Sequence, residues 1–86
     1  MDIYIKPKKK VTLSNRTVVL IGDVADVVAT KEVAGKVKKM PLMAIDDDAG
    51  RKQNHLVSIT DMIAAIQKSY PNATVNNVGE MDTWVQ

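Results

Sequence analysis

Hydrophobic and polar residues alternate at the start of the chain and then give way to a continuous apolar run. The segment Ile3–Lys6 precedes Pro7, and apolar positions resume over Val11–Leu13. Proline is tolerated at a sheet edge, and lysines there discourage unwanted pairing, so this segment predicts a strand at or near an edge. The β-branched run Thr17–Ile21 predicts a buried strand.

The middle of the chain carries weaker helical signals. Asp23 follows Gly22 and has the residue type of an N-cap, which predicts a short helix running through Val28. Between Glu32 and Met40, apolar residues recur at spacings of four and three, which indicates one or two further helical turns. Pro41 ends that helix, and the residues that follow it, 42–45, predict a short strand.

The clearest helix follows a short strand over His55–Val57. Ser58 and Asp61 have the spacing of a capping box, and Val57 with Met62 has that of the accompanying hydrophobic staple. One face of the helix is apolar and comprises Met62, Ile63, Ile66 and Tyr70. Pro71 then stops the helix.

Two strands close the chain, over Ala73–Val78 and Thr83–Val85, and the residues between them predict a hairpin. The order of elements predicts an α+β fold: small mixed or antiparallel sheets with two or three short helices packed on them, rich in strands, with a hairpin at the C-terminus. Residues 1–86 suffice for one domain. Because the chain stops at Gln86, in or just after a strand, we expect it to be excised from a longer protein.

Composition narrows the classes of function. The chain has no Cys, so disulfides, thiol metal sites and thiol nucleophiles are excluded. Its formal charge is only +2, so basic and acidic side chains nearly balance. No apolar run approaches the length that crosses a bilayer, and lysines occupy the place of a signal peptide's apolar segment.

Candidate chemical groups do not combine into a recognisable site. Asp46 and Asp48 have the spacing of calcium-loop ligands, but Gly50 stands one place early and Val57 replaces the bidentate glutamate. His55 is the only histidine, and no Ser or carboxylate has a spacing that argues for a shared site, so we expect a partly exposed residue at a strand start. The sequence therefore predicts a non-enzymatic protein with no catalytic residues, metal or cofactor.

Binding through surface residues is the remaining class of function. Lys6, Lys8, Lys9 and Lys10 form a basic cluster that fits a solvated edge, an anionic lipid surface, or a protein or nucleic-acid partner. Only three aromatic residues occur, which argues against stacking on single-stranded nucleic acid. Trp84 is a candidate interface anchor, although the single Trp of a small domain commonly lies in the core.

Several segments together resemble the N-terminal domain of stage V sporulation protein AA from endospore-forming Bacillales and Clostridia. They are Val18–Val28, Lys39–Leu42, Leu56–Ile66, Tyr70–Pro71 and Val75–Glu80. Each segment alone is a short structural motif, and their order and spacing carry the resemblance, which covers nearly the whole chain.

The resemblance implies a soluble domain that precedes C-terminal membrane-spanning helices, in an assembly of the inner spore membrane. That assembly moves dipicolinic acid, complexed with calcium, into the developing spore and out during germination. The family implies no catalytic motif for this subunit, and dipicolinate recognition is ascribed to other subunits.

We therefore expect an assembly domain that docks on itself or on another subunit. The expected means is strand addition at exposed edges, which are the lysine-bearing first strand and the terminal hairpin around Trp84. The alternative is a module that binds anionic lipid through Lys6–Lys10.

Overall fold

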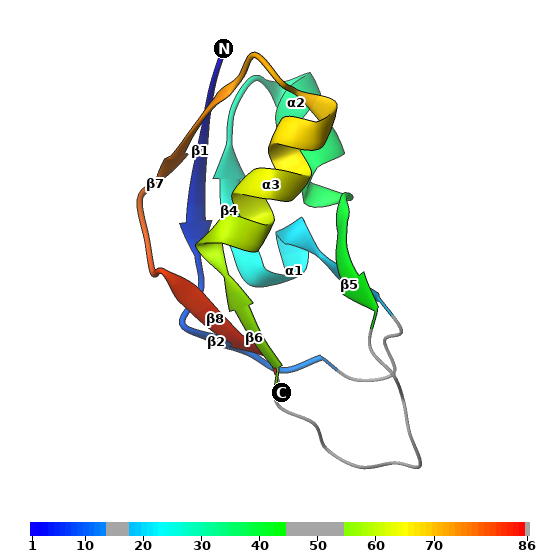
Figure 1. The fold of residues 1–86 in the computed structure, drawn as a ribbon, viewed down its shortest axis with the longest axis vertical. Helices are drawn as coiled ribbons and strands as arrows, with labels where there is room; N and C mark the ends of the chain where they lie inside the picture. The colour runs from blue at the N-terminus through cyan, green and yellow to red at the C-terminus, as the bar shows by residue number, and fades with distance from the viewer. Residues whose placement is uncertain (14–17, 45–54, 86) are drawn as a thin grey trace.

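The computed structural model of the 86-residue chain describes residues 1–13, 18–44 and 55–85, which form short strands and helices (Figure 1). In chain order the elements are β1 (Asp2–Pro7), β2 (Lys10–Val11), β3 (Val18–Leu20), α1 (Ile21–Val24), β4 (Ala25–Val28), α2 (Lys31–Lys38), β5 (Pro41–Ala44), β6 (His55–Ser58), α3 (Ile59–Ser69), β7 (Thr74–Asn77) and β8 (Asp82–Val85). The predicted α+β class is confirmed, with small mixed and antiparallel sheets.

The described strands form two three-stranded sheets and one two-stranded ribbon. The upper sheet has the order β4-β1-β7, with β1 antiparallel to β4 and parallel to β7. The lower sheet has the order β2-β8-β6, with β8 parallel to β2 and antiparallel to β6. The third sheet pairs β3 with β5.

The upper and lower sheets are two halves of one bent ribbon. The chain leaves β1 and enters β2 after two residues, while β7 leads into β8 beside it, and both pairings are parallel. Asp2 lies opposite Thr74, and Lys10 lies opposite Trp84. The segment from Thr74 to Trp84 is therefore two residues longer than the segment from Asp2 to Lys10 that runs beside it. The extra residues break the ladder and bend the ribbon, as a β-bulge does (Figure 1).

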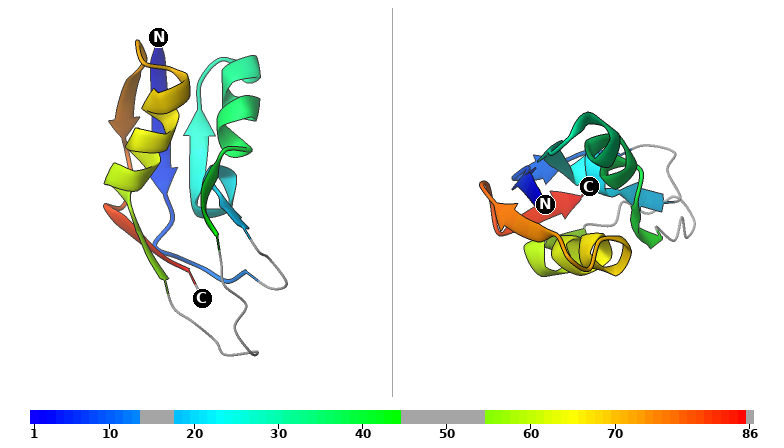
Figure 2. Two further views of the ribbon diagram at one scale, coloured as in Figure 1. Left: turned by 45° about the vertical axis from the view of Figure 1, so that its right-hand side comes forward. Right: turned by 90° about the horizontal axis from the view of Figure 1, so that it is seen from above.

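Alternation along β1 puts one face of the upper sheet into the core. Ile3, Ile5 and Pro7 are buried, whereas Tyr4 and Lys6 are exposed. The helices cover the buried face: in Figure 2, α3 lies beside β1 and β7, and α2 lies beside β4. Their buried residues complete the core, namely Val33 and Val37 of α2 with Ile59, Met62 and Ile66 of α3.

The capping box predicted for α3 is present. Ser58 Oγ accepts a hydrogen bond from the Asp61 amide at 3.3 Å, and the Ser58 amide donates to Asp61 Oδ2 at 3.4 Å. Because these bonds satisfy amides at the helix start, they fix where α3 begins. The helix ends before Pro71, as predicted, and the expected helix over 32–40 is confirmed as α2.

The prediction of a helix from Asp23 through Val28 is wrong. Helix α1 spans only Ile21–Val24, and residues 25–28 form β4, in which Ala25 and Val27 are buried. Pairing with β1 imposes a period of two on this segment and overrides its weak helical spacing. Leu20 is the N-cap of α1, and Asp23 is the third residue of the helix. The Asp23 carboxylate accepts a hydrogen bond from the Leu20 amide at 2.8 Å.

The structure also corrects two expectations about strand pairing. β1 lies in the centre of its sheet, between β4 and β7, whereas β2, the second part of the predicted segment, is an edge strand of the lower sheet. β7 and β8 belong to different sheets, so they do not form the predicted C-terminal hairpin. Local turn residues favoured a hairpin, but parallel pairing with the distant strands β1 and β2 gave each strand a different partner.

Three hydrogen bonds made by backbone groups of Lys8 and Lys9 hold the two sheets together at the bend. The Lys8 amide donates to the Val24 carbonyl at 2.8 Å, and the hydroxyl of Thr83 donates to the Lys8 carbonyl. The Trp84 amide donates to the Lys9 carbonyl at 3.1 Å. Thr83 is fully buried, so its hydroxyl supplies a donor that no water can replace there.

Two glycines, each in a helix, should respond oppositely to alanine. At Gly35, on the exposed side of α2, an added Cβ meets no atom within 4 Å, so Gly35→Ala should raise the free energy of unfolding by about 0.5–1 kcal/mol. At Gly22 an added Cβ would lie 2.9 Å from the Lys38 carbonyl oxygen, so Gly22→Ala should lower it by about 1–3 kcal/mol. Urea denaturation of both variants checks the pair, and a stabilised Gly22→Ala would contradict this packing of α1 on α2.

Thr83→Val keeps the side-chain shape but removes the hydroxyl at the bend. The Lys8 carbonyl then loses the donor that the buried Thr83 side chain supplies, so the free energy of unfolding should fall by about 1–3 kcal/mol. Thr74→Val is the matched control, because Thr74 is an exposed strand residue; its effect should stay within about 0.5 kcal/mol. Equal unfolding midpoints for the two variants would show that the Thr83 hydroxyl does not hold the sheets together.

Candidate interaction surface

An apolar and basic row crosses the outer face of the lower sheet. In the ladder Trp84 of β8 lies between Lys10 of β2 and Leu56 of β6. Thr83 and Val85 point into the core, so strand alternation turns Trp84 outward. Leu56 and Trp84 are each 49% exposed, which leaves them open to a partner.

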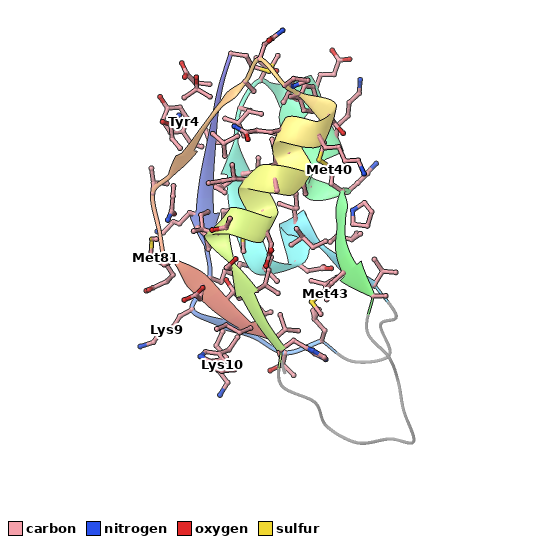
Figure 3. The ribbon with its side chains drawn as sticks, viewed as in Figure 1. Tyr4, Lys9, Lys10, Met40, Met43 and Met81 are labelled. Atoms are coloured by element: carbon pink, nitrogen blue, oxygen red, sulfur yellow. The ribbon has the colours of Figure 1, made fainter. Side chains whose placement is uncertain are left out.

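Charges of both signs flank Trp84 on this face. Lys10 is exposed on the neighbouring strand, and Asp82 is exposed two residues earlier on β8 itself, opposite Ser58. We call the set Lys10, Leu56, Asp82 and Trp84 the lower face. Figure 3 shows the side chains of Lys9 and Lys10 projecting away from the body of the molecule near β8.

The four lysines of the predicted cluster do not form one patch. Lys6 lies on the outer face of the upper sheet, opposite Asp26 in register. Lys8 and Lys9 occupy the bend, where their backbone groups hold the sheets, and Lys10 lies on the lower face. All four side chains are exposed, so the structure leaves each of them available for contact.

A second exposed apolar pair lies on the upper sheet. Tyr4 of β1 is 42% exposed, and Val28, opposite it on β4, is 64% exposed. Lys6 and Asp26 form the next outward-facing pair on the same two strands. Opposite charges already face each other here within one molecule, which distinguishes this face from the lower face.

His55 begins β6 and is half-buried, as predicted for a residue at a strand start. Its Nε2 atom is buried without a hydrogen-bond partner in the structure. Among the described residues no three His, Cys, Asp or Glu side chains come close enough to hold a metal ion. The acidic stretch Asp46–Asp48 lies outside the described residues.

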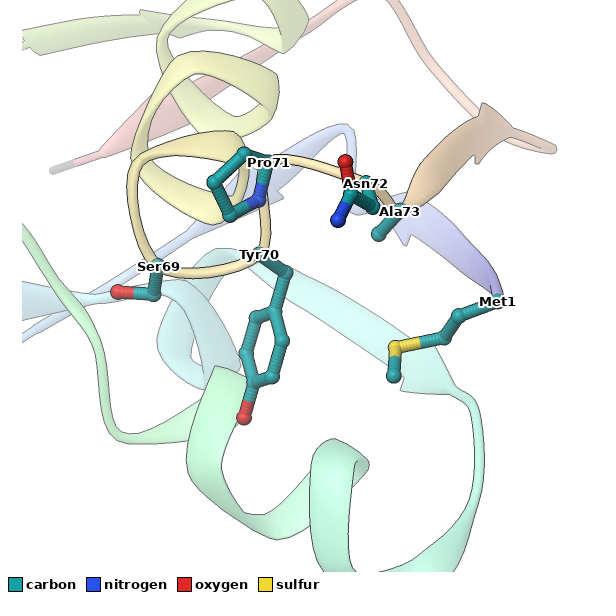
Figure 4. Close-up of a pocket in the computed structure, with 6 residues that line it drawn as sticks. All are labelled: Met1, Ser69, Tyr70, Pro71, Asn72 and Ala73. Carbon is teal, nitrogen blue, oxygen red and sulfur yellow. The ribbon is translucent and has the colours of Figure 1, made fainter.

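A small hollow lies where α3 meets the N-terminus. It has a volume of about 250 Å³ and is lined by Met1, Ser69, Tyr70, Pro71, Asn72 and Ala73. In Figure 4 the Tyr70 ring extends toward α2, and Met1 lies across from it. This volume is below the usual range for ligand pockets. The lining side chains include no carboxylate, amine or imidazole, and the Tyr70 phenol is the one ionisable side chain among them.

Reasoning from the sequence singled out Trp84 but missed Leu56 and Asp82. Both belong to short segments whose outward side depends on which strand they pair with. The predicted hairpin paired β8 with β7, whereas the structure pairs it with β6 and β2. The period of two in Asp82–Val85 is the one signal that could have placed Asp82 and Trp84 on one face.

No helix in the described part of the chain has the length and apolar character needed to cross a membrane. The chain is similar to a solved structure of a functionally unknown protein from Eubacterium ventriosum, with a TM-score of 0.86 and 27% sequence identity. That likeness covers 99% of this chain and 90% of the other. No curated protein matches the chain.

The family model of stage V sporulation protein AA matches residues 1–86, the whole chain. This match agrees with the resemblance carried by the segments over Val18–Val28 and Leu56–Ile66. The chain therefore belongs to the stage V sporulation protein AA family.

Proposed function

We propose that this chain is a non-catalytic interaction domain of a sporulation membrane complex that moves dipicolinic acid. In this role it docks on other subunits, while segments outside residues 1–86 attach it to the inner spore membrane. Membership of the stage V sporulation protein AA family supports the sporulation role. The part that concerns dipicolinic acid rests on what the family resemblance implies.

The half-exposed Trp84 is the observation that carries the docking role. Trp is enriched among residues that dominate binding energies, because a large rigid ring buries much surface at low entropic cost. Here the ring stands on a rigid central strand, with Leu56 beside it and the Trp84 amide bonded to Lys9. A partner that covers the lower face would bury both apolar side chains together.

Docking through a face replaces the strand addition expected from the sequence. β1 and β8 are central strands, so their backbone groups already pair on both sides. The sheet edges that the structure offers instead are β4 and β7 in the upper sheet and β2 and β6 in the lower sheet. None of these four strands carries the predicted anchor Trp84.

A second candidate function is binding to an anionic membrane surface. Exposed lysines near a half-exposed Trp are typical of groups that settle at a lipid headgroup boundary, and Lys10 lies beside Trp84. Sedimentation with vesicles tests it: anionic vesicles should retain the chain at low salt, and neutral vesicles should not. Recovery of all the protein in the supernatant with both vesicle types would rule this function out.

Trp84→Ala should weaken docking on the partner subunits by at least about 30-fold, since truncation removes a hot-spot ring. We expect spores of a strain with this variant to hold less dipicolinic acid at an unchanged level of the protein. Co-purification from sporulating cells and a dipicolinic acid assay measure the two effects.

Tyr4→Ala is the matched control, because Tyr4 is an exposed aromatic residue on the other sheet, and it should leave both measurements near wild type. Full co-purification of the Trp84→Ala variant would exclude the lower face as the docking site. Normal dipicolinic acid content after deletion of the whole domain would exclude the transport role.

A further inference from the structure

We propose that the lower face pairs with the same face of a second copy of this chain, in a twofold-symmetric dimer with Trp84 near the axis. The inference rests on the proposed interaction role and names one partner for it. The surface consists of Trp84 and Leu56 with Lys10 and Asp82, all exposed on one side of the lower sheet.

The positions of the two charges make this face self-complementary. Lys10 is the neighbour of Trp84 across the strands, at about 4.8 Å between strand axes, and Asp82 is its neighbour two residues along β8, at about 6.6 Å. An axis that lies in the face and runs midway between Lys10 and Asp82 therefore passes close to Trp84.

Rotation about that axis gives three contacts at once. It sets Lys10 of each copy opposite Asp82 of the other and sets Trp84 against Trp84. A twofold interface requires that each surface complement itself, and this rotation meets that requirement because it places the cation of each copy on the anion of the other. The rings supply apolar burial, and the two charge pairs at the rim set the register.

The charges also favour a second copy over a lipid surface. An anionic membrane attracts Lys10 but repels Asp82, and Glu80 is a further exposed carboxylate just before β8. A second copy uses both signs. The outer face of the upper sheet differs in register, because Lys6 lies directly opposite Asp26 on the neighbouring strand, whereas Lys10 and Asp82 are offset by two residues.

The size of the face indicates a weak dimer. Two half-exposed apolar side chains make a patch well below that of a standard protein interface. We therefore expect a Kd on the order of 10–100 µM. An interaction of this strength forms where copies are concentrated, for example side by side in one assembly.

Charge reversal tests the register of the dimer. Sedimentation equilibrium at up to about 1 mM chain should show the wild type mostly dimeric, whereas Lys10→Glu and Asp82→Lys should each raise the Kd by roughly tenfold or more, because each creates two like-charge contacts. An equimolar mixture of the two variants should recover the wild-type Kd as a heterodimer. Lys68→Glu, which reverses an exposed lysine on α3, should change nothing, and circular dichroism checks that all variants fold.

Three results would overturn the dimer. They are a monomeric wild type at the highest concentration, equal weakening by Lys68→Glu, and a mixture of variants that stays as weak as each variant alone. A monomeric wild type that binds anionic vesicles more strongly after Asp82→Lys would assign the face to a lipid surface instead. A monomeric wild type whose Trp84→Ala variant still loses its partner subunits would remove the dimer and leave the proposed function standing.

Discussion

The bend between the two three-stranded sheets depends on the peptide groups of Lys8 and Lys9. The Lys8 amide and carbonyl bond to Val24 and to the buried Thr83 hydroxyl, and the Lys9 carbonyl accepts from the Trp84 amide. These bonds join β1, the end of α1 and β8 at one point, and they leave the lysine side chains in solvent. The basic segment therefore has a structural role through its backbone and a separate capacity for contact through its side chains.

The same bonds determine what the lower face presents. Because β2 is fixed on β8 through Lys9, Lys10 lies beside Trp84. Because Thr83 points inward, its neighbours Asp82 and Trp84 point outward. The arrangement of cation, ring and anion is thus a consequence of where the ribbon bends and of the strand period.

Local signals predicted the local elements of this fold. The capping box of Ser58 and Asp61 placed the start of α3, and Pro71 placed its end. The segment after Asp23 was misassigned because its valines fit both a helical and a strand spacing, and only pairing with β1 decides between them. Trp84 could be nominated from its residue type, but its companion Leu56 depends on the register between β6 and β8. Pairings of this kind join residues far apart in the chain, and no single stretch of sequence encodes them.

The parallel pairing of β1 with β7 bears on how the domain is made in the cell. Asp2 and Thr74 are partners, so the first strand leaves the ribosome long before the strand that completes its sheet. Until then β1 has only β4 beside it, and Ile3 and Ile5 are without their full cover. Contacts of such long range slow folding, because a large loop closes before they form. The nascent chain therefore acquires its final structure only after β7 has emerged, and until that moment β4 is the one strand of this sheet that shields the first strand from association with other chains.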